Sequence, residues 1–185
     1  MISETVNIEI NTVALNDKVL SKDSWLVVMH ANRIPPHVGV LINGNYNSLT
    51  IKGHELNVTI EALLKTISQK KIESVFIKLK KHPVFSLDHQ TEMFKETIKK
   101  FGPVRQNEAT CLSPIKLFFE EFYAVQLIEA ELYYDLMKRL NYNSYLEFAG
   151  ALNFEMHKNV MELPFYTIDE LNETIKAQRL PYYKD

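Results

Sequence analysis

The chain has 185 residues, of which 46% are hydrophobic, and its 21 basic and 23 acidic side chains give a net charge of −2. This composition is typical of one globular domain with an ordinary core, and it argues against binding to nucleic acid and against a membrane span. No signal-peptide pattern is visible at the N-terminus and there is a single cysteine, so we expect a cytoplasmic protein without an internal disulfide.

The hairpin around Asn43-Gly44 is the strongest structural signal in the first half of the chain. Asn-Gly is a preferred two-residue turn between antiparallel strands, and alternating side chains give each strand two faces. With this turn, or with Gly44-Asn45 as the turn, His37 at the head of the first strand shares a face with Ser48 and Thr50. A three-residue loop would bring Asn47 to that face in place of Ser48.

The other elements follow from hydrophobic period and from capping residues. Strands are predicted at 5–10, 25–29 and 73–79, and helices after Asn57, over 86–100 and over 113–140. Ser113 is expected to cap the last of these helices, and a break near Gln126 would divide it. Strands that come before most of the helices, joined by a hairpin, predict an α+β fold with an antiparallel sheet packed on helices.

The region 141–185 has a different character. Ser144-x-x-Glu147 and Thr167-x-x-Glu170 both match the capping box that opens a helix, and two loops combine proline with aromatic residues. We therefore predict a core over 1–140 and a C-terminal helical appendage over 141–185 that packs on the core.

Two docking positions are open to this appendage. It packs either on the back of the core or over the cleft between His37 and Cys111. If it covers the cleft, Tyr166 or the Tyr182-Tyr183 pair should lie close to Cys111.

Cys111 lies directly before a predicted helix. Helix N-terminal N–H groups and a nearby imidazole both stabilise a thiolate, so we expect a lowered thiol pKa and a nucleophilic role. His37 is the candidate general base because a strand would hold it rigidly, and Ser48 or Thr50 would fix its tautomer. The alternative is that Cys111 is a small buried apolar residue and that His37 only caps a strand end.

The segments His37-Val38-Gly39-Val40 and Thr110-Cys111-Leu112-Ser113 resemble motifs of the permuted papain-like cysteine hydrolases. These enzymes are the circularly permuted branch of the bacterial cell-wall amidopeptidase superfamily, which also resembles the lecithin–retinol acyltransferase group. The resemblance covers residues 25–125 and implies a papain-like fold in which histidine precedes cysteine. By position, Ser48 matches the residue that orients the histidine. The chain departs from the family at Ser48, where Glu or His is usual, and at Leu112, where a polar or small residue is usual.

The resemblance implies a hydrolase or acyltransferase that acts on an amide or ester bond of a small-molecule, peptide or lipid-like substrate. Cys111 would attack, His37 would act as base and then acid, Ser48 would orient His37, and the Cys111 N–H would help bind the oxyanion. No metal and no organic cofactor is expected, because the histidine spacings match no metal-ligand pattern and the five glycines form no phosphate loop. The alternative function is a non-catalytic binding or scaffold module that retains the papain-like fold.

Overall fold

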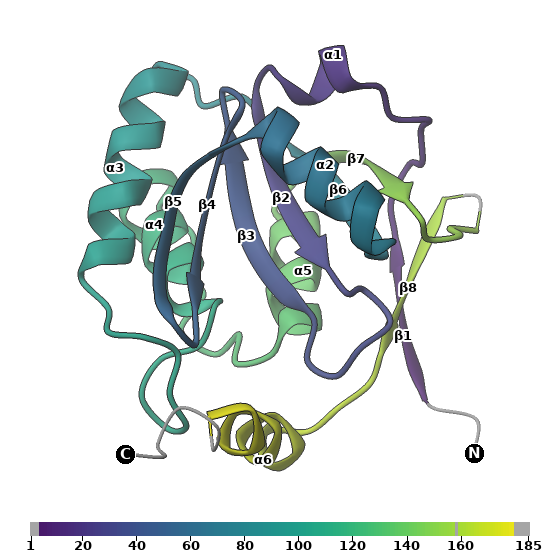
Figure 1. The fold of residues 1–185 in the computed structure, drawn as a ribbon. Helices are drawn as coiled ribbons and strands as arrows, with labels where there is room; N and C mark the ends of the chain where they lie inside the picture. The colour runs from purple at the N-terminus through teal and green to yellow at the C-terminus, as the bar shows by residue number, and fades with distance from the viewer. Residues whose placement is uncertain (1–3, 158, 180–185) are drawn as a thin grey trace.

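Alternating and continuous apolar runs build an antiparallel sheet of six strands in the order β5-β4-β3-β2-β6-β7 (Figure 1). The protein is seen in a computed structural model that describes residues 4–157 and 159–179. The strands of this sheet are β2 (Ser24–Met29), β3 (His37–Ile42), β4 (Asn45–Thr50), β5 (Gly53–Thr59), β6 (Ser74–Leu79) and β7 (Leu146–Leu152). A separate antiparallel pair joins β1 (Thr5–Glu9) to β8 (Val160–Pro164). The fold is α+β, as the sequence predicts.

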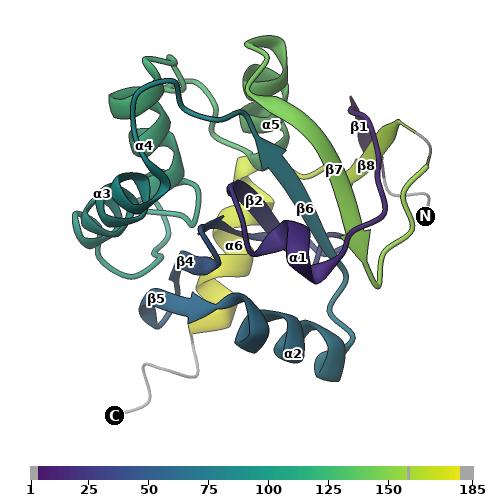
Figure 2. The ribbon, with the colours of Figure 1, turned by 90° about the horizontal axis from the view of Figure 1, so that it is seen from above.

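Helices cover both faces of the six-stranded sheet (Figure 2). The helices are α1 (Asp17–Leu20), α2 (Ile60–Lys70), α3 (Leu87–Lys99), α4 (Ser113–Tyr123), α5 (Tyr133–Tyr142) and α6 (Ile168–Arg179). The apolar stripe of α2 packs with Trp25 and Phe76 in the smaller of two core clusters. Side chains of α3, α4 and α5 pack on the opposite face in the larger cluster. No helix among the described residues combines the length and the apolar character needed to cross a bilayer.

The hairpin between β3 and β4 has the predicted two-residue turn. Asn43 and Gly44 both have positive φ, 49° and 75°, as a type I′ turn requires, and Ile42 pairs with Asn45. The β3 side chains therefore alternate between the two faces of the sheet. Val38, Val40 and Ile42 belong to the larger core cluster, and Leu41 belongs to the smaller cluster, which includes residues of α2. This register places Ser48 on the same face as His37.

The prediction that Asn57 caps a helix is wrong. Asn57 lies inside β5 with a φ of 56°, and its N–H donates to the Asn47 side chain at 2.8 Å. The cap is Thr59, whose hydroxyl accepts from the N–H of Ala62 at 3.3 Å. An irregular register between Tyr46 and Ser48 lets β5 continue past Asn57 before the helix starts.

The region predicted as one helix over 113–140 is two helices. Ala124 adopts the left-handed conformation and ends α4, close to the break considered near Gln126, and α5 starts at Tyr133. Ser113 is the first helical residue rather than the cap. Its hydroxyl accepts from the N–H of Thr110 at 2.9 Å.

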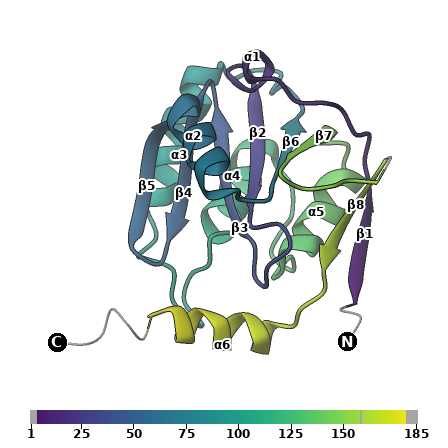
Figure 3. The ribbon, with the colours of Figure 1, turned by 45° about the vertical axis from the view of Figure 1, so that its right-hand side comes forward.

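The C-terminal region contains strands as well as a helix. The helix predicted at Ser144 is wrong, because Ser144 has a φ of 59° and β7 follows as the sheet neighbour of β6. The capping box at Thr167 and Glu170 is confirmed: each side chain accepts from the other residue's N–H, at 3.2 and 2.7 Å. α6 then crosses one end of the sheet (Figure 3). The second proline-aromatic loop, 180–183, lies outside the described residues.

Candidate active site

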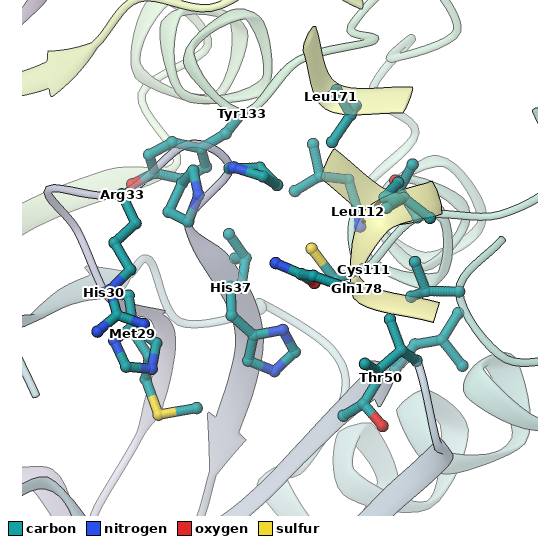
Figure 4. A pocket seen from close by; sticks show the side chains of 18 of the residues that line it. Met29, His30, Arg33, His37, Thr50, Cys111, Leu112, Tyr133, Leu171 and Gln178 are labelled. Atoms are coloured by element: carbon teal, nitrogen blue, oxygen red, sulfur yellow. Dashed lines mark hydrogen bonds between the residues drawn. The ribbon is translucent and has the colours of Figure 1, made fainter. Parts of the chain in front are cut away.

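A pocket of about 370 Å³ opens at the end of the sheet where β3 begins and β4 ends. His37 enters it from β3, Cys111 enters it from the loop before α4, and α6 lies over it. Figure 4 shows the sulfur of Cys111 and the ring of His37 in this same space. The two residues chosen from sequence as nucleophile and base therefore line one pocket, although they lie 74 positions apart in the chain.

The His37 ring is held by a chain of two hydrogen bonds. Its Nε2 lies 3.2 Å from the Ser48 hydroxyl, and that hydroxyl donates to the Glu55 carboxylate at 3.0 Å. Because the one Ser48 proton goes to Glu55, the Ser48 oxygen accepts from the N–H of His37 Nε2. Nδ1 is then unprotonated, which is the tautomer that can accept a proton from a thiol.

Of the three alternatives for the orienting residue, Ser48 is the one that contacts the His37 ring. The Thr50 hydroxyl instead donates to the carbonyl of Gly53 at 3.0 Å, and the Asn47 side chain accepts from the Asn57 N–H. Ser48 is 1% exposed, so water does not compete for its hydrogen bonds.

Glu55 is a site residue that sequence reasoning missed. It pairs with Ser48 across β4 and β5, so its carboxylate supplies the negative partner that Ser48 alone lacks. The signal was present in the sequence. Gly53 follows the end of β4 closely, and a second tight turn there would have placed Glu55 opposite Ser48.

Burial sets the protonation states of the candidate pair. Burial, with a smaller contribution from nearby His30, lowers the pKa of His37 to about 4. Burial also raises the pKa of Cys111, against the effect of the backbone N–H groups of Val38, Cys111 and Leu112. The expectation of a lowered thiol pKa is therefore wrong, because removal of water outweighs the helix terminus. At neutral pH the pair consists of a thiol and a neutral imidazole.

Within the C-terminal region, α6 and the segment before it cover the pocket, whereas β7 and β8 pair with other strands. Leu171 and Ile175 of α6 are buried and line the pocket, and Gln178 projects over it in Figure 4. Tyr166 also lines it, and lies close enough for a charge on Cys111 to raise the tyrosine pKa, after the larger effect of burial. This is the position expected of Tyr166 in a covered cleft. Tyr182-Tyr183 lies outside the described residues.

The other histidines have different surroundings. Nδ1 of buried His82 accepts from the N–H groups of Val84 and Phe85, and its Nε2 donates to the Phe122 carbonyl. These bonds fix the loop before α3. Within residues 4–157 and 159–179, no three His, Cys, Asp or Glu side chains come together as a metal site would require.

Comparison of the sequence and the structure with known proteins gave no matching family model, no similar curated protein and no similar solved structure. The resemblance to permuted papain-like hydrolases therefore stays a prediction that rests on the segments around His37 and Cys111.

Proposed function

We propose that the protein is a cysteine hydrolase or acyltransferase that acts on an amide or ester bond. The observation that carries this proposal is a single pocket that holds Cys111 together with His37, whose ring is bonded to Ser48 and through it to Glu55. A nucleophile, a base and a group that fixes the base are the parts that thiol-dependent acyl transfer requires. The expected substrate is a small-molecule, peptide or lipid-like amide or ester, and the expected location is the cytoplasm, where a thiol stays reduced.

In the first half-reaction the neutral pair reacts by general-base catalysis. Nδ1 of His37 takes the thiol proton while Sγ of Cys111 forms a bond to the carbonyl carbon. The tetrahedral intermediate then expels an amine or alcohol, which receives the proton from His37, and a thioester remains on Cys111. The hydrogen bond from Nε2 to Ser48, with Glu55 behind it, stabilises the imidazolium that forms between these two steps.

In the second half-reaction His37 acts on the acceptor. Water, or a second alcohol or amine, attacks the thioester and loses its proton to His37. The bond from carbon to sulfur breaks, and the thiolate of Cys111 regains the proton. Water as acceptor gives hydrolysis, and another alcohol or amine gives acyl transfer.

The oxyanion of both tetrahedral intermediates would lie near the N-terminus of α4. The Cys111 N–H is the candidate donor there, and the helix dipole favours negative charge at this end. The Leu112 N–H is already bonded to the Thr110 hydroxyl at 3.2 Å.

A second function remains as the rival. Burial raises the pKa of Cys111 and α6 covers the pocket, and both features suit a binding or scaffold module in which the thiol does not turn over. The two functions differ in whether an acyl group forms on Cys111 and leaves again.

The test is acylation by p-nitrophenyl acetate, a small activated ester. Mass spectrometry should find one acetyl group on Cys111, and the p-nitrophenol released should exceed one equivalent per protein. Cys111→Ala should lose both, and His37→Gln should slow acylation about 100-fold, the lower end of general-base contributions. His157→Gln changes an exposed histidine outside the pocket and is the matched control.

Two results would contradict hydrolysis. If the folded protein gains no acetyl group on Cys111, the thiol is not a nucleophile. If Cys111 is acetylated once without further release, the binding module is the better description.

A further inference from the structure

One end of the pocket carries polar groups that the proposed reaction does not use. Tyr133 from α5, and His30 and Arg33 from the segment between β2 and β3, line the same pocket as Cys111. In Figure 4 these three residues lie on one side of the His37 ring, and Cys111 and Leu112 lie on the other.

The hydroxyl of Tyr133 is buried without a partner. The residue is 1% exposed, and its oxygen has no hydrogen-bond partner among the described residues. Burial raises the pKa of Tyr133 well above its ordinary value, so the hydroxyl keeps its proton and remains a donor. A buried donor without an acceptor is rare and destabilising, and a bound group that accepts its proton would remove that cost.

Arg33, an exposed residue in the pocket lining, supplies a permanent positive charge at the same end. It is the only lysine or arginine among the described residues that line the pocket, and no carboxylate in the described chain lies within ion-pair distance of it. Its charge contributes to a lowered pKa of His30, after the larger effect of burial, so His30 adds no competing positive charge at neutral pH. The acid in the pocket lining, Glu55, accepts the hydrogen bond of Ser48.

Apolar walls join the polar end to the reactive end. The lining residues that form them include Val38, Leu49, Val104, Leu112, Leu171 and Ile175. A ligand that reaches from one end to the other therefore has a polar terminus, an apolar middle and a carbonyl group at Cys111.

We propose that Tyr133 and Arg33 bind an anionic group, a carboxylate or a phosphate, of the substrate whose amide or ester bond lies at Cys111. This assignment rests on the proposed function and names its substrate class. The guanidinium pairs with carboxylate and phosphate oxygens, and the hydroxyl donates one further hydrogen bond. The acidic group and the scissile carbonyl are joined by an apolar chain that fills the middle of the pocket.

The test compares charged and neutral esters of equal length. Mono-p-nitrophenyl esters of adipate, suberate and sebacate are compared with the same esters whose free acid is capped as a methyl ester. A parallel series with a terminal phosphonate distinguishes carboxylate from phosphate. At the chain length that spans the pocket, acylation of Cys111 should favour the charged ester.

Arg33→Gln and Tyr133→Phe should each lower this preference by roughly tenfold, the range expected for a hydrogen bond to a charged group. Acylation by the capped esters gives the reference rate for each variant, so the preference is a ratio of two rates measured on the same protein. Arg105→Gln removes an exposed arginine that pairs with Glu108 outside the pocket, and should leave the preference unchanged. Thermal melts of all variants establish that they are folded.

A binding measurement keeps the assignment testable without turnover. Suberate should raise the melting temperature of the Cys111→Ala protein, and Arg33→Gln and Tyr133→Phe should remove that shift. If the capped esters acylate Cys111 as well as the charged esters at every length, the anion site is wrong and the proposed function stands. If no ester acylates Cys111 but suberate binding depends on Arg33 and Tyr133, the anion site stands and the proposed function is wrong.

Discussion

Gly39 in β3 has no side chain, and the ring of Tyr46 in β4 occupies the space beside it. A Cβ atom placed on Gly39 would lie 2.5 Å from Cε2 and from the hydroxyl oxygen of Tyr46. Tyr46 is 0% exposed and packs among the residues of the α2 face, so its ring has no free space to move into. Gly39 is two residues from His37 on the same strand, so the Tyr46 ring packs against the strand that carries His37.

Gly39→Ala should destabilise the protein by about 1–3 kcal/mol, the usual cost of forcing extra volume into a packed core. Denaturant unfolding measures this change. Gly102→Ala is the matched control, because a Cβ atom there meets nothing within 4 Å. Equal stability of the two variants would contradict the close packing of Tyr46 on Gly39.

Some of the candidate site residues could be predicted from the sequence, and others could not. Cys111 and His37 were found because a helix start and a strand start mark them, and Ser48 was found because an Asn-Gly turn determines the register of the hairpin. Glu55 was missed because β5 itself was not predicted. Arg33 and Tyr133 reach the pocket through packing of segments distant in sequence, and no local pattern reports such a contact.

α6 closes the pocket mainly through apolar contacts. Leu171 and Ile175 are 8% and 3% exposed and line the pocket. Within the part of the chain that the structure describes, the hydrogen bonds and ion pairs of α6 stay inside the helix and its cap at Thr167. The capping box stabilises the first turn of α6, and the attachment of α6 to the pocket rests on its apolar side chains.

Replacement of Leu171 and Ile175 together by serine should weaken the contact of α6 with the pocket. Labelling of Cys111 by a bulky maleimide should then become roughly tenfold faster or more, because each apolar side chain contributes a few kcal/mol when buried. The matched control replaces Glu173 and Lys176, on the exposed side of α6, by serine. The rate is followed by mass spectrometry, with a circular dichroism melt of each variant.

An unchanged labelling rate in the folded Leu171 and Ile175 variant would show that α6 does not restrict access to Cys111. In that case its role is structural support.

The antiparallel sheet brings segments from the whole chain to one end of the molecule. The start of β3, the loop before α4 and α6 come together there (Figure 3). His37, Cys111 and Tyr166, from these segments, line one pocket. The α+β class could be predicted because the apolar periods of strands and helices and the Asn-Gly turn are local signals. β7 could not, because Ser144-x-x-Glu147 imitates a capping box and the strand is stabilised by its pairing with β6.

The central claim is that Cys111 and His37 react as a pair, and the rate of Cys111 alkylation by iodoacetamide as a function of pH tests it most directly. At neutral pH the unmodified protein should react roughly tenfold faster or more than His37→Gln, because the imidazole accepts the thiol proton. The two alkylation rates should become equal well above pH 8.5, the ordinary pKa of a thiol, because thiolate forms there without a base. The ratio of the two rates should also decrease as the pH approaches the His37 pKa of about 4, because the imidazole is then protonated and cannot accept the thiol proton. Identical profiles for the unmodified protein and His37→Gln, or labelling of Cys111 only after denaturation, would contradict the claim.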